Sequence, residues 1–439
     1  MRIAIIGGGV GGTTLAFQLR KRNKEAEIYI IEASEHTEYS PCSMPYTISN
    51  NQLSLDGIYV FKEEDYEQNN IKLIKNTRVE DIFPSQKKLK LQTNSTTSEL
   101  FYDKLVIATG GHPFIPPIKG LDKVKYSAFT NIDNAREIIG KLGNNKRYAI
   151  IGGGFIGVEV AYSLAEKGKT ANLIEAKESI LPGILDKDMA RNVQEYLKDK
   201  INLLLNKQVR EVKENLIILD DKTIDYDSLI ITAGTRANKD IAERAGLEVD
   251  NGILIDKKGK TSEEDIFALG DCAQLKDAKM QPAQLASIAT IQAEALSRTI
   301  LGEETEFPKP TNASITKIGN VFVASVGMNS QQIEGRAISG KYSGKTKEDF
   351  IPNAKDISVK ILAEEDGKLL GAQIIGEEEV LGRIDVLSLA FQKGMSIYDL
   401  AEAETAYHPF CAPIFDPIVL AAKNAIRKLE FLKTRRKDR

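Results

Sequence analysis

The sequence has little of what marks secreted, membrane-spanning or nucleic-acid-binding proteins. It contains only three cysteines in 439 residues, Cys42, Cys272 and Cys411, and so few, so widely spaced, do not form the disulfide framework of a secreted domain. The formal net charge of −3 gives no basic field for nucleic acid. No apolar run reaches the ~18 residues of a membrane span. We expect a cytoplasmic protein with no nucleic-acid or membrane partner.

The two ends of the sequence agree with this expectation. Met1 and Arg2 lead directly into an apolar strand, without the charged and apolar regions of a signal peptide. The basic residues Lys433, Arg435, Arg436, Lys437 and Arg439 form a short tail of the kind that is usually solvated. The length suggests about three domains of 100–200 residues.

The first stretch contains a dinucleotide-binding pattern. An apolar strand over Arg2 to Ile6 runs into a glycine-rich turn, and an apolar-periodic helix over Thr13 to Arg20 follows. The glycines of such a turn, here Gly7, Gly9 and Gly12, let the backbone approach a pyrophosphate at the helix N-terminus. A second strand, Glu27 to Ile31, ends at Glu32, whose carboxylate can accept a hydrogen bond from a ribose hydroxyl.

The pattern occurs a second time further along the chain. A strand over Arg147 to Ile151 precedes a turn with Gly152, Gly154 and Gly157, a helix through Lys167, and a strand that ends at Glu175. Two dinucleotides are therefore expected in one chain. The carboxylate of Glu175 favours a free 2′-hydroxyl, hence NADH, because it repels a 2′-phosphate, although Lys177 softens that preference.

Two apolar strands end in small residues that let the backbone pass close to a cofactor. One runs over Tyr102 to Gly111, and the other over Tyr226 to Gly234. The proline-rich segment from His112 to Pro117 is predicted to be a stiff linker at a domain boundary.

Cys42 is the candidate reactive atom. It lies in Tyr39-Ser40-Pro41-Cys42-Ser43-Met44-Pro45-Tyr46, which follows the first nucleotide-binding strand and is predicted to open a helix. A helix N-terminus lowers a thiol pKa and favours the thiolate. Pro45 and Thr47 stand where a dithiol motif would place its second cysteine, so Cys42 acts without a local thiol partner. The alternative is a buried, inert cysteine.

The segment from Thr261 to Asp271 resembles the second flavin fingerprint of the FAD-dependent pyridine nucleotide–disulfide oxidoreductases. Together with both glycine turns and both small-residue strand ends, this resemblance covers nearly the whole chain. It implies an α/β fold with two Rossmann-like domains, for FAD and NAD(P)H, and a C-terminal α+β dimerisation domain. The expected domains are residues 1–112 and 252–310 for FAD, 113–251 for NAD(P)H, and 311–439 for the interface.

The resemblance also implies cofactor contacts. In the family, the acid that corresponds to Asp271 bonds the ribityl chain of the flavin, and a helix that starts at Pro282 directs its N-terminus at the isoalloxazine. The implied FAD contacts are Gly7, Gly9, Val10, Gly12, Glu32, Ala33, Ser43, Val79, Ala108, Thr109, Gly110, Gly270, Asp271 and Ala286. The implied NAD(P)H contacts are Gly152, Gly154, Phe155, Ile156, Gly157, Glu159, Glu175 and Gly234, with NADPH as the alternative nucleotide. No metal site is expected, and Cys272 is expected to be a packing residue.

The Cys42 segment resembles the single-cysteine branch of the family, which includes coenzyme A-disulfide reductases, NADH oxidases, NADH peroxidases and sulfur or persulfide reductases. Val10 stands where the peroxidases carry a histidine, which disfavours peroxide chemistry. Cys-x-x-Pro-Tyr and Ala406-Tyr407-x-Pro409 resemble the coenzyme A-disulfide reductases. Phe350 replaces a second tyrosine of those enzymes, as in the oxidases, and Pro41 replaces an asparagine.

By the same resemblance, the region from Thr311 onward is the interface domain of a homodimer. Its segment Thr405 to Cys411 is expected to reach Cys42 of the other subunit. Tyr407 or His408 would act as proton donor there, since the pKa range of histidine suits that role; for His408 a surface histidine is the alternative. A second thiol role for Cys411 stays open.

Three functions follow from these residues. The first is NAD(P)H-dependent reduction of a disulfide or sulfur substrate, with coenzyme A disulfide as the leading substrate and coenzyme A as an adduct on Cys42. The second is an NADH oxidase that reduces oxygen and cycles Cys42 through sulfenic acid. The third is a non-enzymatic redox-sensing flavoprotein. A membrane quinone reductase is disfavoured because we see no amphipathic C-terminal anchor.

Overall fold

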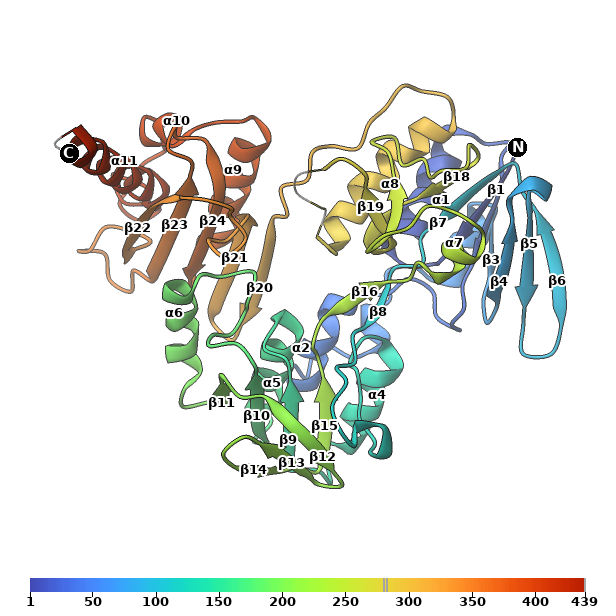
Figure 1. The fold of residues 1–439 in the computed structure, drawn as a ribbon, viewed down its shortest axis with the longest axis horizontal. Coiled ribbons are helices and arrows are strands. Elements are labelled where there is room, and N and C mark those ends of the chain that lie inside the picture. The colour runs from blue at the N-terminus through green and yellow to red at the C-terminus, as the bar shows by residue number, and fades with distance from the viewer. Residues whose placement is uncertain (279–280, 282, 438–439) are drawn as a thin grey trace. The chain divides into compact units, whose positions relative to one another are not determined.

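The computed structural model describes residues 1–278, 281 and 283–437, with the backbone alone at 436 and 437. The chain forms two compact units, each built from segments that are distant in sequence (Figure 1). Unit 1 comprises residues 1–114, 130–136 and 234–310, and unit 2 comprises residues 115–129, 137–233 and 311–439. No helix of the described part of the chain is long and apolar enough to cross a membrane.

Unit 1 is organised around a five-stranded parallel sheet. Its strand order is β18-β7-β1-β2-β3, and the strands are β1 (Arg2–Ile6), β2 (Glu27–Ile31), β3 (Ile71–Ile74), β7 (Lys104–Ile107) and β18 (Ile266–Ala268). Ile3, Ile5 and Val106 are fully buried, as expected for a sheet covered on both faces. Helices α1 (Val10–Arg22) and α8 (Ala286–Ile300) pack against each other beside it.

The other elements of unit 1 surround this sheet. Three antiparallel strands form a second sheet, and two short strand pairs link the segments. These elements are β4 (Arg78–Phe83), β5 (Lys88–Gln92), β6 (Thr97–Phe101), β8 (Gly111–Pro113), β16 (Thr235–Ala237), β17 (Ile253–Ile255), β19 (Ala273–Leu275), α2 (Met44–Ser49), α3 (Glu63–Gln68) and α7 (Asp240–Arg244). Helix α4 (Ile132–Lys141) begins in unit 1.

Unit 2 repeats the parallel arrangement on a smaller scale. Its four-stranded sheet has the order β11-β10-β9-β15, with strands β9 (Arg147–Ile151), β10 (Thr170–Glu175), β11 (Asn202–Leu205) and β15 (Ser228–Ile231). Helix α5 (Phe155–Glu166) crosses from β9 to β10, and α6 (Lys187–Leu197) from β10 to β11. A small antiparallel sheet follows, made of β12 (Val209–Lys213), β13 (Leu216–Leu219) and β14 (Thr223–Asp225).

A five-stranded antiparallel sheet forms the rest of unit 2. Its order is β20-β21-β24-β23-β22, and its strands are β20 (Ser314–Ile318), β21 (Val321–Gly327), β22 (Ile338–Lys345), β23 (Asp356–Ala363) and β24 (Leu369–Gly376). Helix α9 (Val380–Gln392) packs on β21 and β24, and α11 (Pro417–Lys437) on β22 and β23, with α10 (Ile397–Ala401) beside α11 (Figure 1). The buried side chains between sheet and helices form one apolar core.

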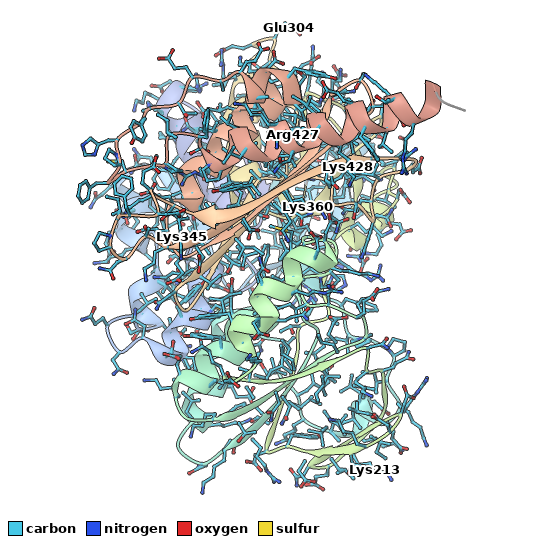
Figure 2. The ribbon with its side chains drawn as sticks, turned by 90° about the vertical axis from the view of Figure 1, so that its left-hand side faces the viewer. Lys213, Glu304, Lys345, Lys360, Arg427 and Lys428 are labelled. Atoms are coloured by element: carbon cyan, nitrogen blue, oxygen red, sulfur yellow. The ribbon has the colours of Figure 1, made fainter. Side chains whose placement is uncertain are left out.

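A buried ionic cluster joins this sheet to the parallel part of unit 2. Lys360 of β23 lies between the sheet and α6 (Figure 2), with its Nζ 2.8 Å from Asp186 and 2.6 Å from Asp188. Ser330 donates its backbone N–H and its hydroxyl to Asp186. Removing one partner of such a cluster leaves a buried charge unpaired, so the cluster fixes α6 to β23.

The observed elements confirm the predicted α/β fold with an α+β C-terminal part. Strands β1, β2 and β9 have the predicted limits. The helix expected from Pro282 begins instead at Ala286, where Leu285 is extended; Pro282 itself lies outside the described residues, as do the side chains of Arg436 and Lys437 and all of Arg439.

The units divide the chain differently from the expected domains. The segment predicted as a linker, His112 to Pro117, contains the change from unit 1 to unit 2 after Phe114, but His112 and Pro113 belong to β8 and pair with β16. That pairing returns the chain to unit 1 at Gly234, before the expected boundary at residue 252. Unit 2 contains both the second glycine turn and the C-terminal sheet. The ionic cluster of Lys360 connects these two parts of the unit.

Candidate functional site

The first glycine turn has the geometry that a pyrophosphate needs. Gly7 follows β1 with a φ of +110°, and a Cβ there would lie 2.2 Å from the carbonyl oxygen of Ala108. A Cβ on Gly12 would lie 2.0 Å from the carbonyl oxygen of Gly7, whereas nothing lies within 4 Å of the Cβ position of Gly9. Two glycines therefore allow close packing, and Gly9 leaves open space above the loop.

Glu32 holds this turn in place. Its Oε2 accepts the N–H of Gly8 at 2.7 Å, and its Oε1 accepts the N–H of Ser34 at 2.8 Å. A carboxylate has about four acceptor positions, so both oxygens keep capacity for a ribose hydroxyl. Glu32 thus has a structural task that the sequence did not reveal, besides the predicted nucleotide contact.

The predicted FAD contacts of unit 1 meet at one edge of its parallel sheet. Gly7 follows β1, Glu32 and the exposed Ala33 follow β2, Ala108 begins the small-residue segment after β7, and Gly270 comes shortly after β18. Because the carboxyl ends of parallel strands share an edge, this is where a doubly wound sheet binds a ligand. The other predicted contacts lie as follows: Val10 begins α1, Ala286 begins α8, Thr109 and Gly110 follow Ala108, and Val79 is buried in β4.

Asp271 provides the test of whether a flavin fits. It lies in the turn Gly270–Cys272 after β18, where burial raises the pKa of its carboxyl. Among the described residues no side chain or backbone N–H donates to this carboxylate. A half-buried acceptor without a protein donor is complementary to a ligand hydroxyl, which a ribityl chain supplies, so the residues present fit FAD.

Cys272 is a packing residue. Its side chain is fully buried, and its Sγ donates to the carbonyl oxygens of Leu269 at 3.2 Å and Ile107 at 3.4 Å. Burial raises the pKa of this thiol. A thiol that stays protonated and inaccessible is a poor nucleophile, so Cys272 is no redox partner for Cys42.

Cys42 is exposed and lies in the 3₁₀ turn Pro41–Ser43, just before α2. Cys42 therefore lies in the first turn of a helical segment, as expected, but the α-helix itself begins two residues later, at Met44 and Pro45, which are buried. Ser40 and Ser43 share a hydroxyl hydrogen bond of 2.8 Å across the turn. The turn thus presents the Cys42 thiol at the surface of unit 1, while α2, with six residues, is too short to supply a strong dipole.

Glu38 is a residue that sequence reasoning missed. It is 5% exposed, and its Oε2 has no hydrogen-bond partner among the described residues. Burial raises the pKa of this carboxyl to about 7, opposed by a hydrogen bond with Thr13. Thr13 lies in α1 and also donates to the carbonyl oxygen of Gly8. A buried acid therefore lies between the glycine turn and the Cys42 segment; its only sequence signal is an acid four residues before the cysteine.

The second glycine turn, in unit 2, has nearly the same geometry. Gly152 has a φ of +113°, and a Cβ on Gly157 would lie 2.0 Å from the carbonyl oxygen of Gly152. Glu175 accepts the N–H groups of Gly153 and Lys177, each at 2.7 Å. The turn is therefore built to hold a second dinucleotide, as predicted. Gly154 and Gly234 have open space at their Cβ positions, and Phe155 and Ile156 begin α5.

Glu159 has a partner in the C-terminal sheet. Thr316 of β20 donates its hydroxyl to the Glu159 carboxylate, and Thr316 is buried. The predicted nicotinamide contact is thus held by the C-terminal sheet of unit 2. Nothing in the sequence pattern connected these two residues.

The predicted C-terminal acid/base residues share one exposed turn of unit 2. The N–H groups of Cys411 and Ala412 donate to the carbonyl oxygen of His408, at 2.8 and 2.9 Å. Tyr407 is 46% exposed and Phe410 62% exposed, and Cys411 is also exposed. These side chains are accessible to a second chain.

The sequence matches models of a known family. The model described as pyridine nucleotide-disulphide oxidoreductase matches residues 1–293, and the model of its dimerisation domain matches residues 314–417. A relative from Methanocaldococcus jannaschii named NADH oxidase is 34% identical, over 98% of this chain and 99% of its own length. A relative from Pyrococcus horikoshii named NAD(P)H coenzyme A polysulfide/persulfide reductase is 26% identical, over 96% of this chain and 98% of its own.

A solved structure agrees with these matches. The NAD-dependent persulfide reductase from A. fulgidus is similar with a TM-score of 0.94 and 29% identity, over 98% of this chain and 84% of that one. The resemblance inferred from the glycine turns and the flavin fingerprint is confirmed. The chain belongs to the pyridine nucleotide-disulphide oxidoreductase family.

Proposed function

We propose that this protein is an FAD-dependent reductase that uses NAD(P)H to reduce a disulfide or sulfur substrate, with coenzyme A disulfide as the leading candidate, through Cys42. Members of the family are FAD-dependent NAD(P)H oxidoreductases. The observation that carries the proposal is the accessible Cys42 thiol in unit 1, where Cys272 is buried. Within unit 1 Cys42 has no second accessible thiol, so it would form a mixed disulfide with the substrate.

The chain's own residues divide the work in this proposal. Unit 2 binds NAD(P)H at Gly152, Gly154, Gly157 and Glu175, and unit 1 binds FAD at the first glycine turn, Glu32 and Asp271. When bound, the flavin relays two electrons from NAD(P)H to sulfur. Each cofactor contact predicted from the sequence, Ser43, Val79 and Gly234 included, is part of this proposal.

Cys42 performs the sulfur chemistry. Its thiolate attacks one sulfur of the substrate; the new bond is a mixed disulfide, the old sulfur–sulfur bond breaks, and one thiolate leaves. The two electrons then cleave the mixed disulfide and return Cys42 and a second thiolate. Tyr407 or His408 donates a proton to a leaving thiolate.

The proton donors come from a second subunit in this proposal. Residues 314–417 match the dimerisation domain of the family. Leu381, Val386 and Leu389 of α9 are each more than half exposed, as are Phe410, Ile414 and Phe415. An apolar surface of this kind favours association with a second copy, which we propose is a homodimer with the Tyr407 turn at the partner's Cys42.

An NADH oxidase is the second candidate. The relative from M. jannaschii carries that name, and Phe350, which is 73% exposed, lacks the hydroxyl that the coenzyme A-disulfide reductases have at this place. In the oxidase reaction Cys42 would cycle through sulfenic acid.

Steady-state assays with matched cysteine variants separate these functions. Wild type is expected to oxidise NADH with coenzyme A disulfide under anaerobic conditions and to release two thiols per NADH. Cys42→Ser is expected to lose this turnover while it keeps FAD, and Cys411→Ser, which removes the other exposed thiol, is the control.

Each alternative gives a distinct result. If NADH oxidation consumes a stoichiometric amount of oxygen without added disulfide, the protein is an NADH oxidase and the reductase proposal is wrong. Turnover in Cys42→Ser equal to wild type would remove the cysteine from the mechanism. Negligible NADH oxidation with every acceptor would favour the redox sensor.

A further inference from the structure

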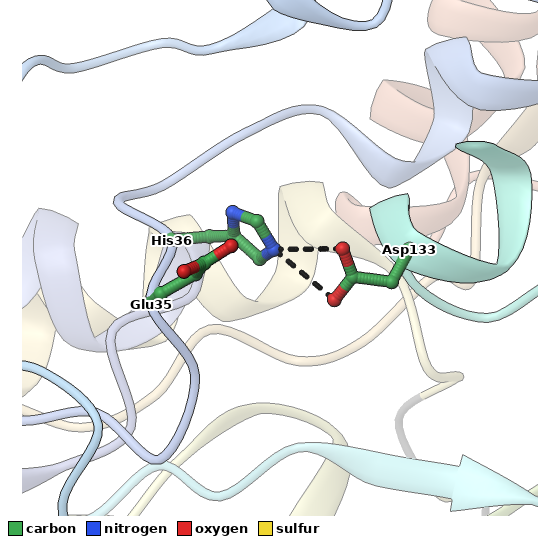
Figure 3. Close-up of side chains that lie close together, drawn as sticks. All are labelled: Glu35, His36 and Asp133. Atoms are coloured by element: carbon green, nitrogen blue, oxygen red, sulfur yellow. Dashed lines mark hydrogen bonds and ion pairs between the residues drawn. The ribbon is translucent and has the colours of Figure 1, made fainter.

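A buried histidine lies between two carboxylates in unit 1, and none of the three residues has been assigned a role above. His36 follows β2 and is 7% exposed. Its Nε2 lies 3.1 and 3.2 Å from the two carboxylate oxygens of Asp133, at the start of α4. Figure 3 shows the Glu35 carboxylate beside the same ring, and one ligand atom from each of the three residues lies within 4.8 Å of the others.

We propose that Glu35, His36 and Asp133 bind a divalent cation, with zinc as the preferred ion. One imidazole nitrogen and two carboxylates, completed by water, are a donor set that zinc accepts. No metal site was predicted from the sequence. Asp133 is 97 positions from His36, a spacing that no ligand motif contains.

The distances fit an ion between the side chains. Two ligand atoms that are each about 2.0–2.1 Å from a tetrahedral zinc ion lie about 3.3 Å apart. The observed separations of Nε2 from the Asp133 oxygens are 3.2 and 3.1 Å. Glu35 and Asp133 are exposed side chains, so small rotations can bring their oxygens to bonding distance.

Tyr59 is placed as an outer partner of the proposed ligand. Its hydroxyl is 2.7 Å from His36 Nδ1. Metal-binding histidines usually donate the N–H of their other ring nitrogen, which fixes the tautomer. Because a phenol hydroxyl both donates and accepts, Tyr59 can accept from Nδ1 when Nε2 binds a metal.

The surroundings offer access and a favourable charge. A hollow of about 600 Å³ is lined by His36, Tyr59, four glutamates and two lysines, namely Glu35, Glu63, Glu64, Glu67, Lys62 and Lys75. Lys75 is paired with Glu63, which leaves three glutamates against Lys62, so the remaining lining carries a net negative charge. Opposing this, Arg136 lies 3.1 Å from Asp133 Oδ1, which lowers the affinity for a cation without blocking Oδ2.

The cation would tie α4 to the segment that leads to Cys42. The N–H of Ile132 already donates to the hydroxyl of Tyr39 at 3.3 Å, and Tyr39 and Tyr59 pair as an isolated bridge. The contact of His36 with Asp133 is a second connection between the same two segments, and a metal would replace it by coordination bonds. The proposal therefore concerns stability and order of this loop, separately from the redox reaction.

Equilibrium dialysis of the FAD-loaded protein against micromolar ZnCl₂ tests the site. Wild type is expected to bind one zinc per chain at this site. His36→Ala should weaken that binding by more than about 100-fold, and Tyr59→Phe by about tenfold. His112→Ala is the control, because His112 is exposed and its ring bonds Asn238, outside the proposed site.

Two further variants and an X-ray absorption spectrum test the zinc site without relying on His36→Ala. Asp133→Asn changes an exposed side chain and should weaken binding even if His36→Ala fails to fold, whereas Arg136→Met should tighten it. X-ray absorption of the bound zinc should show nitrogen and oxygen neighbours only. Sulfur neighbours, unchanged binding in Asp133→Asn, or no zinc bound by wild type would each overturn the proposal.

Discussion

The two glycine turns of this chain are nearly superimposable in their local contacts, yet their surroundings differ. In each, a glycine of positive φ follows the first strand, the last glycine packs on its carbonyl oxygen, and a glutamate accepts the next backbone N–H. In unit 1 a later segment, the turn Gly270–Cys272, contributes the carboxylate of Asp271. The second turn has Glu159, held by Thr316 of the C-terminal sheet.

The difference shows where cofactor identity is encoded. The shared glycine geometry provides a pyrophosphate site in either unit. Among the described residues, the Asp271 carboxylate of unit 1 has no protein donor, so a ribityl hydroxyl could donate to it. Glu32 and Glu175 hold corresponding places in the two turns and do not distinguish them. We therefore expect the turns to provide dinucleotide binding, and the residues around each turn to decide between flavin and nicotinamide.

Replacing the last glycine of each turn by alanine should weaken dinucleotide binding at one site without affecting the other. Gly12→Ala and Gly157→Ala each place a Cβ 2.0 Å from a backbone oxygen, and overpacking of this kind costs about 1–3 kcal/mol. Gly12→Ala is expected to lower FAD affinity by about 10–100-fold, measured by flavin fluorescence. Gly157→Ala should keep FAD and raise the Kd of NADH by a similar factor; loss of flavin from Gly157→Ala would contradict the division.

Asp271→Leu should weaken the binding of FAD without affecting the binding of NADH. The substitution removes the carboxylate that would accept a flavin hydroxyl, and no residue of unit 2 was assigned a corresponding role. A hydrogen bond to a charged group contributes about 1.5–3 kcal/mol, so FAD affinity should fall about 10–100-fold while NADH binding is kept. Equilibrium dialysis of FAD and titration with NADH measure both; equal losses would mean that Asp271 supports the fold as a whole.

Glu175→Gln tests the nucleotide choice of the second turn. The amide keeps an acceptor for one backbone N–H but removes the charge that repels a 2′-phosphate. The ratio of kcat/KM for NADPH to that for NADH is expected to rise about tenfold. Structural damage alone would lower both values and leave their ratio unchanged, which is the result that would contradict this role.

Glu38→Gln should have the smallest effect, and one that depends on pH. The folded-state pKa of Glu38, about 7, lies above its ordinary value of 4.5, so its contribution to stability is full below about pH 4.5 and is lost as the pH rises through about 7. Relative to wild type, Glu38→Gln is therefore expected to raise Tm by about 2–4 °C at pH 8, with a smaller difference at pH 5. A difference in Tm that does not change with pH would refute the assignment.

Strands buried on both faces were the best predicted elements. β1, β2 and β9 are continuous apolar runs whose limits the sequence shows directly. β22 was missed because its glycines and lysines give no apolar alternation. The long α11 was also missed, although its buried side chains, such as Ala421 and Ala425, pack on the C-terminal sheet.

The candidate site was predicted in its local parts only. The glycine turns depend on neighbouring residues, so sequence spacing suffices. Contacts between distant segments, such as Glu159 with Thr316 and His36 with Asp133, arise from tertiary packing. Burial of Glu38 was likewise hidden, because glutamate is usually exposed.

The central claim is that electrons from NAD(P)H reach the sulfur of Cys42 in unit 1. Peptide mass spectrometry before and after anaerobic addition of one equivalent of NADH tests it, on protein first oxidised with coenzyme A disulfide. The Cys42 peptide is expected to carry a coenzyme A adduct before NADH and a free thiol afterwards, with the Cys411 peptide unchanged by NADH. A Cys42 peptide that carries no adduct, or keeps it after NADH oxidation, would contradict the claim.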